Sequence, residues 1–223
     1  MKPKLHAADL FILGIILAPY LYLGYVYDRL PAMVATHFGF DGKPNDYSSR
    51  QSMWYIISLM AGVSIFMFLL FRFMPKIDPK KTAKYSAEVF NKIAVAVVLL
   101  LSVLSCLITN AALVGGFKFG SAMPVLMGVF FAFMGNIMHS IKPNYFAGIR
   151  TPWTLESEET WRLTHQFGGK LWFVGGIVIA ITGFIVPAAI ETYVLIGGLA
   201  ILAIVPIVYS YTCFKSLQKN KQS

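Results

Sequence analysis

The chain has 223 residues, of which 57% are apolar and 13% are charged, and its mean hydropathy is +0.66. These values exclude an ordinary soluble domain and indicate an integral membrane protein. The formal net charge of +9 would suit nucleic-acid binding in a soluble protein, but the basic residues are spread over short segments between apolar runs. That distribution favours attraction to anionic membrane surfaces and argues against direct contact with nucleic acid.

Six apolar windows predict an all-α, polytopic membrane protein with six transmembrane helices. Each window is close to the ~20 residues that a helix needs to cross a bilayer core. The windows cover residues 10–27, 53–71, 93–114, 123–141, 171–190 and 193–214. Three of the connections between them are longer than a simple hairpin requires, and these carry most of the polar residues.

The basic residues fall unevenly on the two sides of this predicted bundle. Fifteen of the 19 Lys and Arg residues lie near the termini or in the second and fourth connections; the other four are Arg29, Lys43, Arg50 and Lys118. Cytoplasmic segments carry an excess of Lys and Arg, so the fifteen are expected in the cytoplasm. Both termini are therefore predicted to be cytoplasmic, in a multipass protein.

These windows and connections divide the chain into four predicted segments. The first is a two-helix N-terminal membrane unit at 1–75, which contains a structured extracellular loop at 28–52. A basic cytoplasmic connection at 76–92 leads to a four-helix membrane unit at 93–214, which contains a cytoplasmic motif loop at 142–170. The last is a basic cytoplasmic tail at 215–223. The basic connection is expected to contact anionic lipid. Docking of a soluble partner is the alternative.

The predicted extracellular loop contains turn-forming residues. Turns at Asp41-Gly42 and around Pro44 flank a short aromatic stretch, which predicts an ordered loop with one strand-like piece. His37, Asp41 and Asp46 form a candidate contact for a peptide arriving from outside, because the carboxylates would attract basic peptides. A solvated loop held by local turns is the alternative.

The membrane windows contain no central charged residue, which argues against an ion-coupled transporter. The fourth window does carry a stripe of small and polar residues, because Gly128, Ala132, Asn136 and His139 share one helical face. Close helix packing explains small residues in such a stripe. For Asn136 and His139, near the predicted cytoplasmic end, packing and function remain alternatives.

The segment 142–165, KPNYFAGIRTPWTLESEETWRLTH, crowds ionisable and aromatic residues into one place in a mostly apolar chain. Pro143 and Pro152 interrupt helix formation and Gly148 permits an unusual backbone angle, so the IRTPWT run is expected to be extended or turned. Ser157 is a favourable N-cap for a short cytoplasmic helix whose first turn is acidic.

One face of this predicted short helix combines charged and aromatic side chains. Glu158, Trp161, Arg162 and His165 share that face, with Glu158 and Arg162 in ion-pair register. Because the helix is amphipathic, it is expected to lie along the membrane surface, with Trp153 and Trp161 as interfacial anchors.

Structure, binding and catalysis remain open as roles for the motif segment. Arg150 could pair with a carboxylate, or bind a phosphate as a fork while a His or Glu moves a proton, as in a membrane enzyme acting on a lipid or peptide head group. No nucleophile motif or cofactor fingerprint is present, and Glu158 and His165 are not at metal-ligand spacing, so no cofactor or metal is expected. The candidate residues are Asn136, His139, Asn144, Arg150, Thr151, Trp153, Glu158, Glu159, Trp161, Arg162 and His165.

The run KPNYFAGIRTPWTLESEETWRLTHQFGGKLW resembles the signature of SdpI-like membrane proteins, in which N-x3-G-I-R-T-P-W-T-L, an acidic pair, a Trp and Thr-His recur. The loop LPAMVATHFGFDGKPNDYSSR is similar to the outer loop of the small membrane domain of unknown function that often precedes that signature, although Phe38 stands where the related loop usually has Trp. The signature positions are Asn144, Gly148, Ile149, Arg150, Thr151, Pro152, Trp153, Thr154, Leu155, Glu158, Glu159, Trp161, Thr164 and His165.

The resemblance implies a multipass protein of the bacterial plasma membrane that gives immunity to a secreted antimicrobial or toxin peptide. It also implies signalling by capture of a cytoplasmic transcriptional repressor in some systems. The expected partners are membrane lipids, a peptide toxin at the outer face and such a repressor. Binding is preferred over chemistry, with the lipid-acting or peptide-acting enzyme as the alternative and a transporter third.

Overall fold

The structure is a computed structural model that describes residues 7–39, 44–78, 87–115 and 122–222. By internal contacts the chain forms two compact units, one of residues 1–71 and 93–119 and the other of residues 72–92 and 120–223. The first unit therefore contains the third long helix together with the first two. The segment boundaries predicted at 75, 92 and 214 stay predictions.

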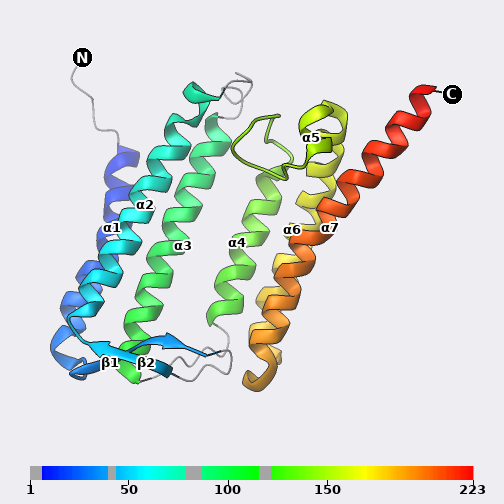
Figure 1. The fold of residues 1–223 in the computed structure, drawn as a ribbon. Helices are drawn as coiled ribbons and strands as arrows, with labels where there is room; N and C mark the ends of the chain where they lie inside the picture. Colours follow the sequence, from blue (N-terminus) through cyan, green and yellow to red (C-terminus); the bar gives the residue numbers. More distant parts are fainter. Residues whose placement is uncertain (1–6, 40–43, 79–86, 116–121, 223) are drawn as a thin grey trace, which may run out of the picture. The chain divides into compact units, whose positions relative to one another are not determined.

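The described residues are mostly helical, in an order that Figure 1 follows by colour. The elements are α1 (Ala7–Val26), a 3-10 turn (Tyr27–Arg29), β1 (Met33–Phe38), β2 (Pro44–Ser49), α2 (Ser52–Ile77), α3 (Ala87–Val114), α4 (Ala122–Met138), α5 (Pro152–Glu156), α6 (Glu158–Ile185) and α7 (Ala188–Gln222). Five of these helices are long and apolar enough to cross a membrane, and α4 is a shorter apolar helix. A polytopic membrane protein is the architecture that results.

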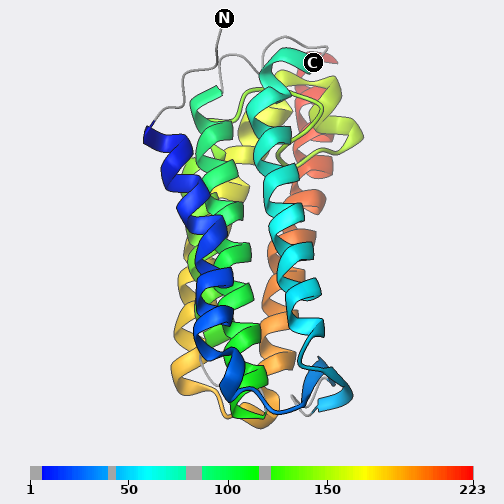
Figure 2. The same cartoon turned by 90° about the vertical axis from the view of Figure 1, so that its left-hand side faces the viewer.

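A β-hairpin replaces the single strand-like piece predicted between α1 and α2. The strands β1 and β2 pair antiparallel, with Met33 opposite Ser49 and an irregular register near His37. Val34 on β1 is 1% exposed and packs in a cluster with Leu23 of α1 and Met53 of α2. Burial of Val34 holds the hairpin against the helices that it joins (Figures 1 and 2).

Polar side chains on α3 are satisfied inside the first unit. The hydroxyl of Ser102 donates to the carbonyl of Ile15 on α1 at 2.8 Å, so it joins two helices. Thr109 donates to the carbonyl of Ser105 one turn earlier at 3.0 Å. Hydroxyls can be buried in this way because each donor keeps a hydrogen bond.

In the second unit, α4 and α6 approach until their backbones touch. A side chain added at Gly128, Gly135 or Gly176 would overlap backbone atoms of the facing helix. Helix α7 packs on the other side of α6, where the indole of Trp172 donates to the carbonyl of Leu202 at 2.8 Å. Glycine is required at the first contact because any Cβ would force the two helices apart.

Candidate functional site

The chain between α4 and α5 is shaped by one buried amide side chain. Asn144 is fully buried; its oxygen accepts from the backbone N–H groups of Phe146 (2.8 Å) and Ala147 (2.7 Å). Its Nδ2 donates to the carbonyls of Lys142 (2.9 Å) and Ala147 (3.0 Å). The hydrogen-bonding capacity of Asn144 is therefore used inside this turn, which makes it a structural residue.

His165 connects this loop to α6. Its Nε2 lies 3.0 Å from the backbone nitrogen of Ile149, and its Nδ1 lies 2.8 Å from the carbonyl oxygen of Trp161. A backbone amide can only donate, so Nε2 is unprotonated and Nδ1 carries the hydrogen given to Trp161. Both ring nitrogens are thus occupied, which leaves neither for a metal ion or a proton relay in this arrangement.

The buried Trp161 and the exposed Gly148 complete the same cluster. The Trp161 ring stacks on the His165 ring, with centroids 4.1 Å apart, and its indole N–H donates to the carbonyl of Ile141 at 2.9 Å. Gly148 has a φ of +109°, and a Cβ there would overlap His165 Nε2. We call Asn144, Gly148, Ile149, Trp161 and His165 the latch.

The short helix α5 is capped by hydroxyls and tied to α7. Thr151 is its N-cap: its hydroxyl accepts from the backbone N–H of Thr154 at 3.2 Å, while the Thr154 hydroxyl accepts from the Thr151 N–H at 2.9 Å. The Thr151 hydroxyl also lies 3.0 Å from that of Ser210 on α7. Pro152 starts this helix, where the sequence predicted an extended or turned chain, because proline is well suited to a first helical position.

The predicted short surface helix is not present as a separate element. Ser157 is the expected N-cap and accepts from the Thr160 backbone N–H at 3.2 Å, but the helix that it starts is α6, which continues for 28 residues. Trp161 is 2% exposed and cannot be an interfacial anchor. Trp153 is half-buried against Tyr211 of α7, with ring centroids 5.0 Å apart.

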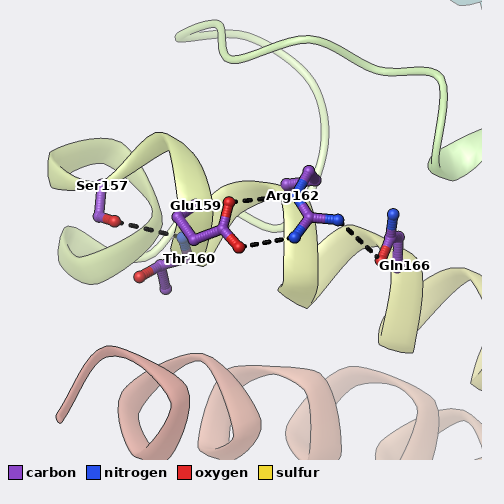
Figure 3. A network of polar contacts seen from close by, with 5 residues as sticks. All are labelled: Ser157, Glu159, Thr160, Arg162 and Gln166. Carbon is purple, nitrogen blue, oxygen red and sulfur yellow. Dashed lines mark hydrogen bonds and ion pairs between the residues drawn. The ribbon is translucent and has the colours of Figure 1, made fainter. Parts of the chain in front are cut away.

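The ion pair on α6 involves a different glutamate from the one predicted. Arg162 donates to both carboxylate oxygens of Glu159, at 2.6 and 3.1 Å, and also to the side-chain oxygen of Gln166 at 3.4 Å (Figure 3). Glu158 is exposed in the same turn. The three-residue spacing brings the forked guanidinium onto Glu159, so the predicted pairing of Glu158 with Arg162 is wrong.

The remaining predicted residues lie on the surface. Arg150 is exposed and donates to the carbonyl of Tyr145 at 2.5 Å. Asn136 and His139 are exposed and line an open groove of about 500 Å³ between α4 and α6. They are thus separate from the latch. The close packing predicted for their stripe is made by its other two members, Gly128 and Ala132, whose backbones touch α6.

The predicted outer-face residues belong to the hairpin. His37 and Asp46 are exposed partners across β1 and β2, and His37 Nδ1 lies 2.5 Å from the Asn45 side-chain oxygen. The Asp46 carboxylate accepts from the Tyr47 backbone N–H at 2.9 Å. Asp41 lies outside the described residues.

Three residues near the site were missed from the sequence, and a fourth, Thr154, was named only as a signature position. Thr154 and Ser210 complete the hydroxyl network, and Gln166 and Lys170 line the groove with Asn136 and His139. Thr154 lies within the signature, so the alternation of hydroxyl residues around Pro152 was an available signal. Nothing local marks Ser210, because it lies 59 positions from its partner.

Two regions of the chain match known families. Residues 140–210 match the SdpI/YfhL protein family, a range that contains the whole latch and Ser210. The chain belongs to the SdpI/YfhL family. Residues 14–61 match a domain of unknown function, DUF1648, which covers the hairpin and parts of α1 and α2 in this SdpI-family chain.

A similar curated protein is the "Immunity protein SdpI" of Bacillus subtilis (strain 168), which is 33% identical over 95 residues. The alignment covers 43% of this chain and 45% of that relative, so the chain matches less than half of the relative's length. No solved structure gives a significant match. This SdpI-family chain is therefore a distant homologue of that immunity protein.

Proposed function

We propose that this SdpI-family membrane protein makes its cell resistant to a secreted antimicrobial or toxin peptide and relays the presence of the peptide to a cytoplasmic regulator. The observation that carries the proposal is the 33% identity to a protein named as an immunity protein. The match of residues 140–210 to the SdpI/YfhL protein family also supports it.

The hairpin is the proposed contact for the peptide. Most side chains of β2 are exposed, including Asp46 and Tyr47, while Val34 anchors β1 to the helices. A carboxylate next to an exposed aromatic ring suits a basic, amphipathic peptide. The excess of Lys and Arg away from this loop predicts that the hairpin faces outward.

The surface around the latch is the proposed contact for the regulator. Arg150 and Glu158 are exposed there, on a backbone whose shape is fixed by the latch. A fixed backbone makes an exposed charged side chain a specific contact, since less conformational entropy is lost on binding. Binding is favoured over catalysis because the His165 ring, the most obvious proton carrier in the segment, is consumed by structural hydrogen bonds.

Survival of a sensitive bacterium tests this proposal. Cells expressing the chain, the Arg150→Ala variant or an Arg162→Ala control would be challenged with toxin peptides and cell-envelope antimicrobials at matched membrane levels. Protection by the parent chain is expected. Signalling, read from a reporter of the cytoplasmic regulator, should be lost in Arg150→Ala and retained in Arg162→Ala. A hairpin double variant, His37→Ala with Asp46→Asn, should lose protection itself.

Three results would contradict the proposal in different ways. Absence of protection by the parent chain at full membrane expression would count against immunity for the agents tested. Conversion of a lipid or peptide by the purified chain would support the enzyme, and uptake of the peptide into vesicles would support a transporter.

A further inference from the structure

A polar groove lies between α4 and α6, and the immunity proposal does not use it. Its floor is formed by Gly135 and Gly169, and its open volume is about 500 Å³. Four polar side chains and one aromatic ring complete the lining. The lining side chains are Asn136, His139, Gln166, Lys170 and Phe173.

The groove exists because the helices touch through glycines. At Gly135 and Gly169 the two backbones are so close that a side chain on either would overlap the other. Neither glycine has a side chain to occupy the space beside this contact, and α4 ends three residues later at Met138. The part of the groove formed by Gly135 and Gly169 is therefore fixed by backbone packing.

The groove lies at the boundary between an apolar and a polar part of α6. From residue 171 to residue 185 this helix has no charged side chain, a length of about 22 Å at the helical rise. Phe173 is 44% exposed and Val174 is 59% exposed just below Lys170. Such a boundary is where lipid headgroups meet acyl chains.

The charges around the groove suit an anion. Lys170 is an exposed basic residue, and no carboxylate is among the lining side chains. Arg162 donates to the oxygen of the Gln166 side chain, which turns the amide nitrogen of Gln166 away from Arg162 (Figure 3). With the side chains of Asn136 and His139, the rim offers a cation and several neutral donors.

We propose that this groove binds the headgroup phosphate of an anionic phospholipid of the phosphatidylglycerol class. Lys170 pairs with the phosphate, and the amides of Asn136 and Gln166 with the His139 ring donate to phosphate or headgroup oxygens. One acyl chain follows the exposed apolar side chains below, beginning at Phe173. The lipid would join the end of α4 to α6 immediately before the loop that carries the latch.

Native mass spectrometry of the full chain, delipidated in detergent and then given defined lipid, tests this site. Phosphatidylglycerol is expected to bind in preference to phosphatidylcholine, and Lys170→Gln should lower the bound fraction about fivefold. The matched control is Lys219→Gln, which removes an exposed lysine of α7 outside the groove and should leave binding unchanged. The Asn136→Ala, His139→Ala double variant should also bind less.

Each contrary outcome identifies a specific error in the proposal. Equal losses of phosphatidylglycerol binding in Lys170→Gln and Lys219→Gln would mean that the lipid is attracted to the basic surface in general, and would overturn the site. Displacement of the lipid by glycerol 3-phosphate or inorganic phosphate would mean a soluble ligand. If Lys170→Gln is misfolded by circular dichroism, unchanged lipid binding in the folded Asn136→Ala, His139→Ala variant would also overturn the proposal.

Discussion

The latch and the groove lie in the same unit and use similar residues in opposite ways. Each contains an asparagine and a histidine: Asn144 and His165 in the latch, Asn136 and His139 in the groove. The first pair is buried and its polar atoms are satisfied by the chain itself. The second pair is exposed to whatever occupies the groove. A polar residue type becomes structural or functional according to where its hydrogen-bond partners come from.

The largest effect is expected from a side chain at Gly148. The Gly148→Ala substitution places an L-residue at φ +109° and pushes its Cβ onto His165 Nε2. It should lower the free energy of unfolding by about 3 kcal/mol or prevent folding. Thermal unfolding in detergent measures this, with Gly197→Ala as the control because its surroundings are open. Equal stability of the two variants would show that the latch geometry is not required.

The two histidines should respond differently to removal. His165→Ala leaves the Ile149 N–H buried without a partner and removes the stack on Trp161, so it should cost about 2 kcal/mol. His139→Ala, at an exposed position, should change stability by about 0.5 kcal/mol or less. Denaturant titration of both variants compares them. Similar losses of stability in the two variants would contradict the distinction between a structural latch and an exposed groove.

The two asparagines give a parallel comparison. Asn144→Asp keeps the oxygen that accepts from Phe146 and Ala147, but it sets a carboxylate against the carbonyls that Nδ2 now contacts. We expect this substitution to lower the free energy of unfolding by about 1 to 2 kcal/mol. Asn136→Asp should leave stability unchanged while weakening binding of anionic lipid. A stable Asn144→Asp variant would mean that the turn forms without this side chain.

A smaller effect is expected where α5 meets α7. Thr151→Val keeps the shape of the side chain but removes the N-cap and the contact with Ser210, at a cost of about 1 kcal/mol. Thr212→Val, an exposed threonine on α7, serves as the control. Hydrogen exchange of the α5 amides should rise only in the first variant. Unchanged exchange would show that packing alone holds α5.

The smallest effect is expected at the surface ion pair. Glu159→Gln removes the partner of Arg162, but both side chains are about half exposed and screened by water and salt. The thermal midpoint should not change measurably at physiological salt, as for Glu158→Gln. A clear loss for Glu159→Gln alone would mean that the pair supports the start of α6.

The local sequence pattern was sufficient to predict features that depend on residues close together in the chain. Each of the six apolar windows overlaps an apolar helix, although window 123–141 extends past the end of α4 and window 171–190 extends past the end of α6 into α7. The N-cap role of Ser157 and the unusual backbone angle at Gly148 follow from the residues themselves. The hairpin was only partly predicted, because β2 is almost entirely polar and has no alternating apolar pattern. The ion pair was assigned to the wrong glutamate because i,i+3 and i,i+4 spacings are both allowed on a helix.

The sequence by itself determined the membrane class, the approximate positions of the apolar helices and the concentration of polar residues around the start of α6. The tertiary structure alone decided which of those polar residues form hydrogen bonds inside the protein. His165 reaches Ile149 across 16 positions and Thr151 reaches Ser210 across 59, and no local periodicity records such contacts. Burial in the latch depends on a loop folding back over one face of α6, so only the packed chain separates His165 from His139.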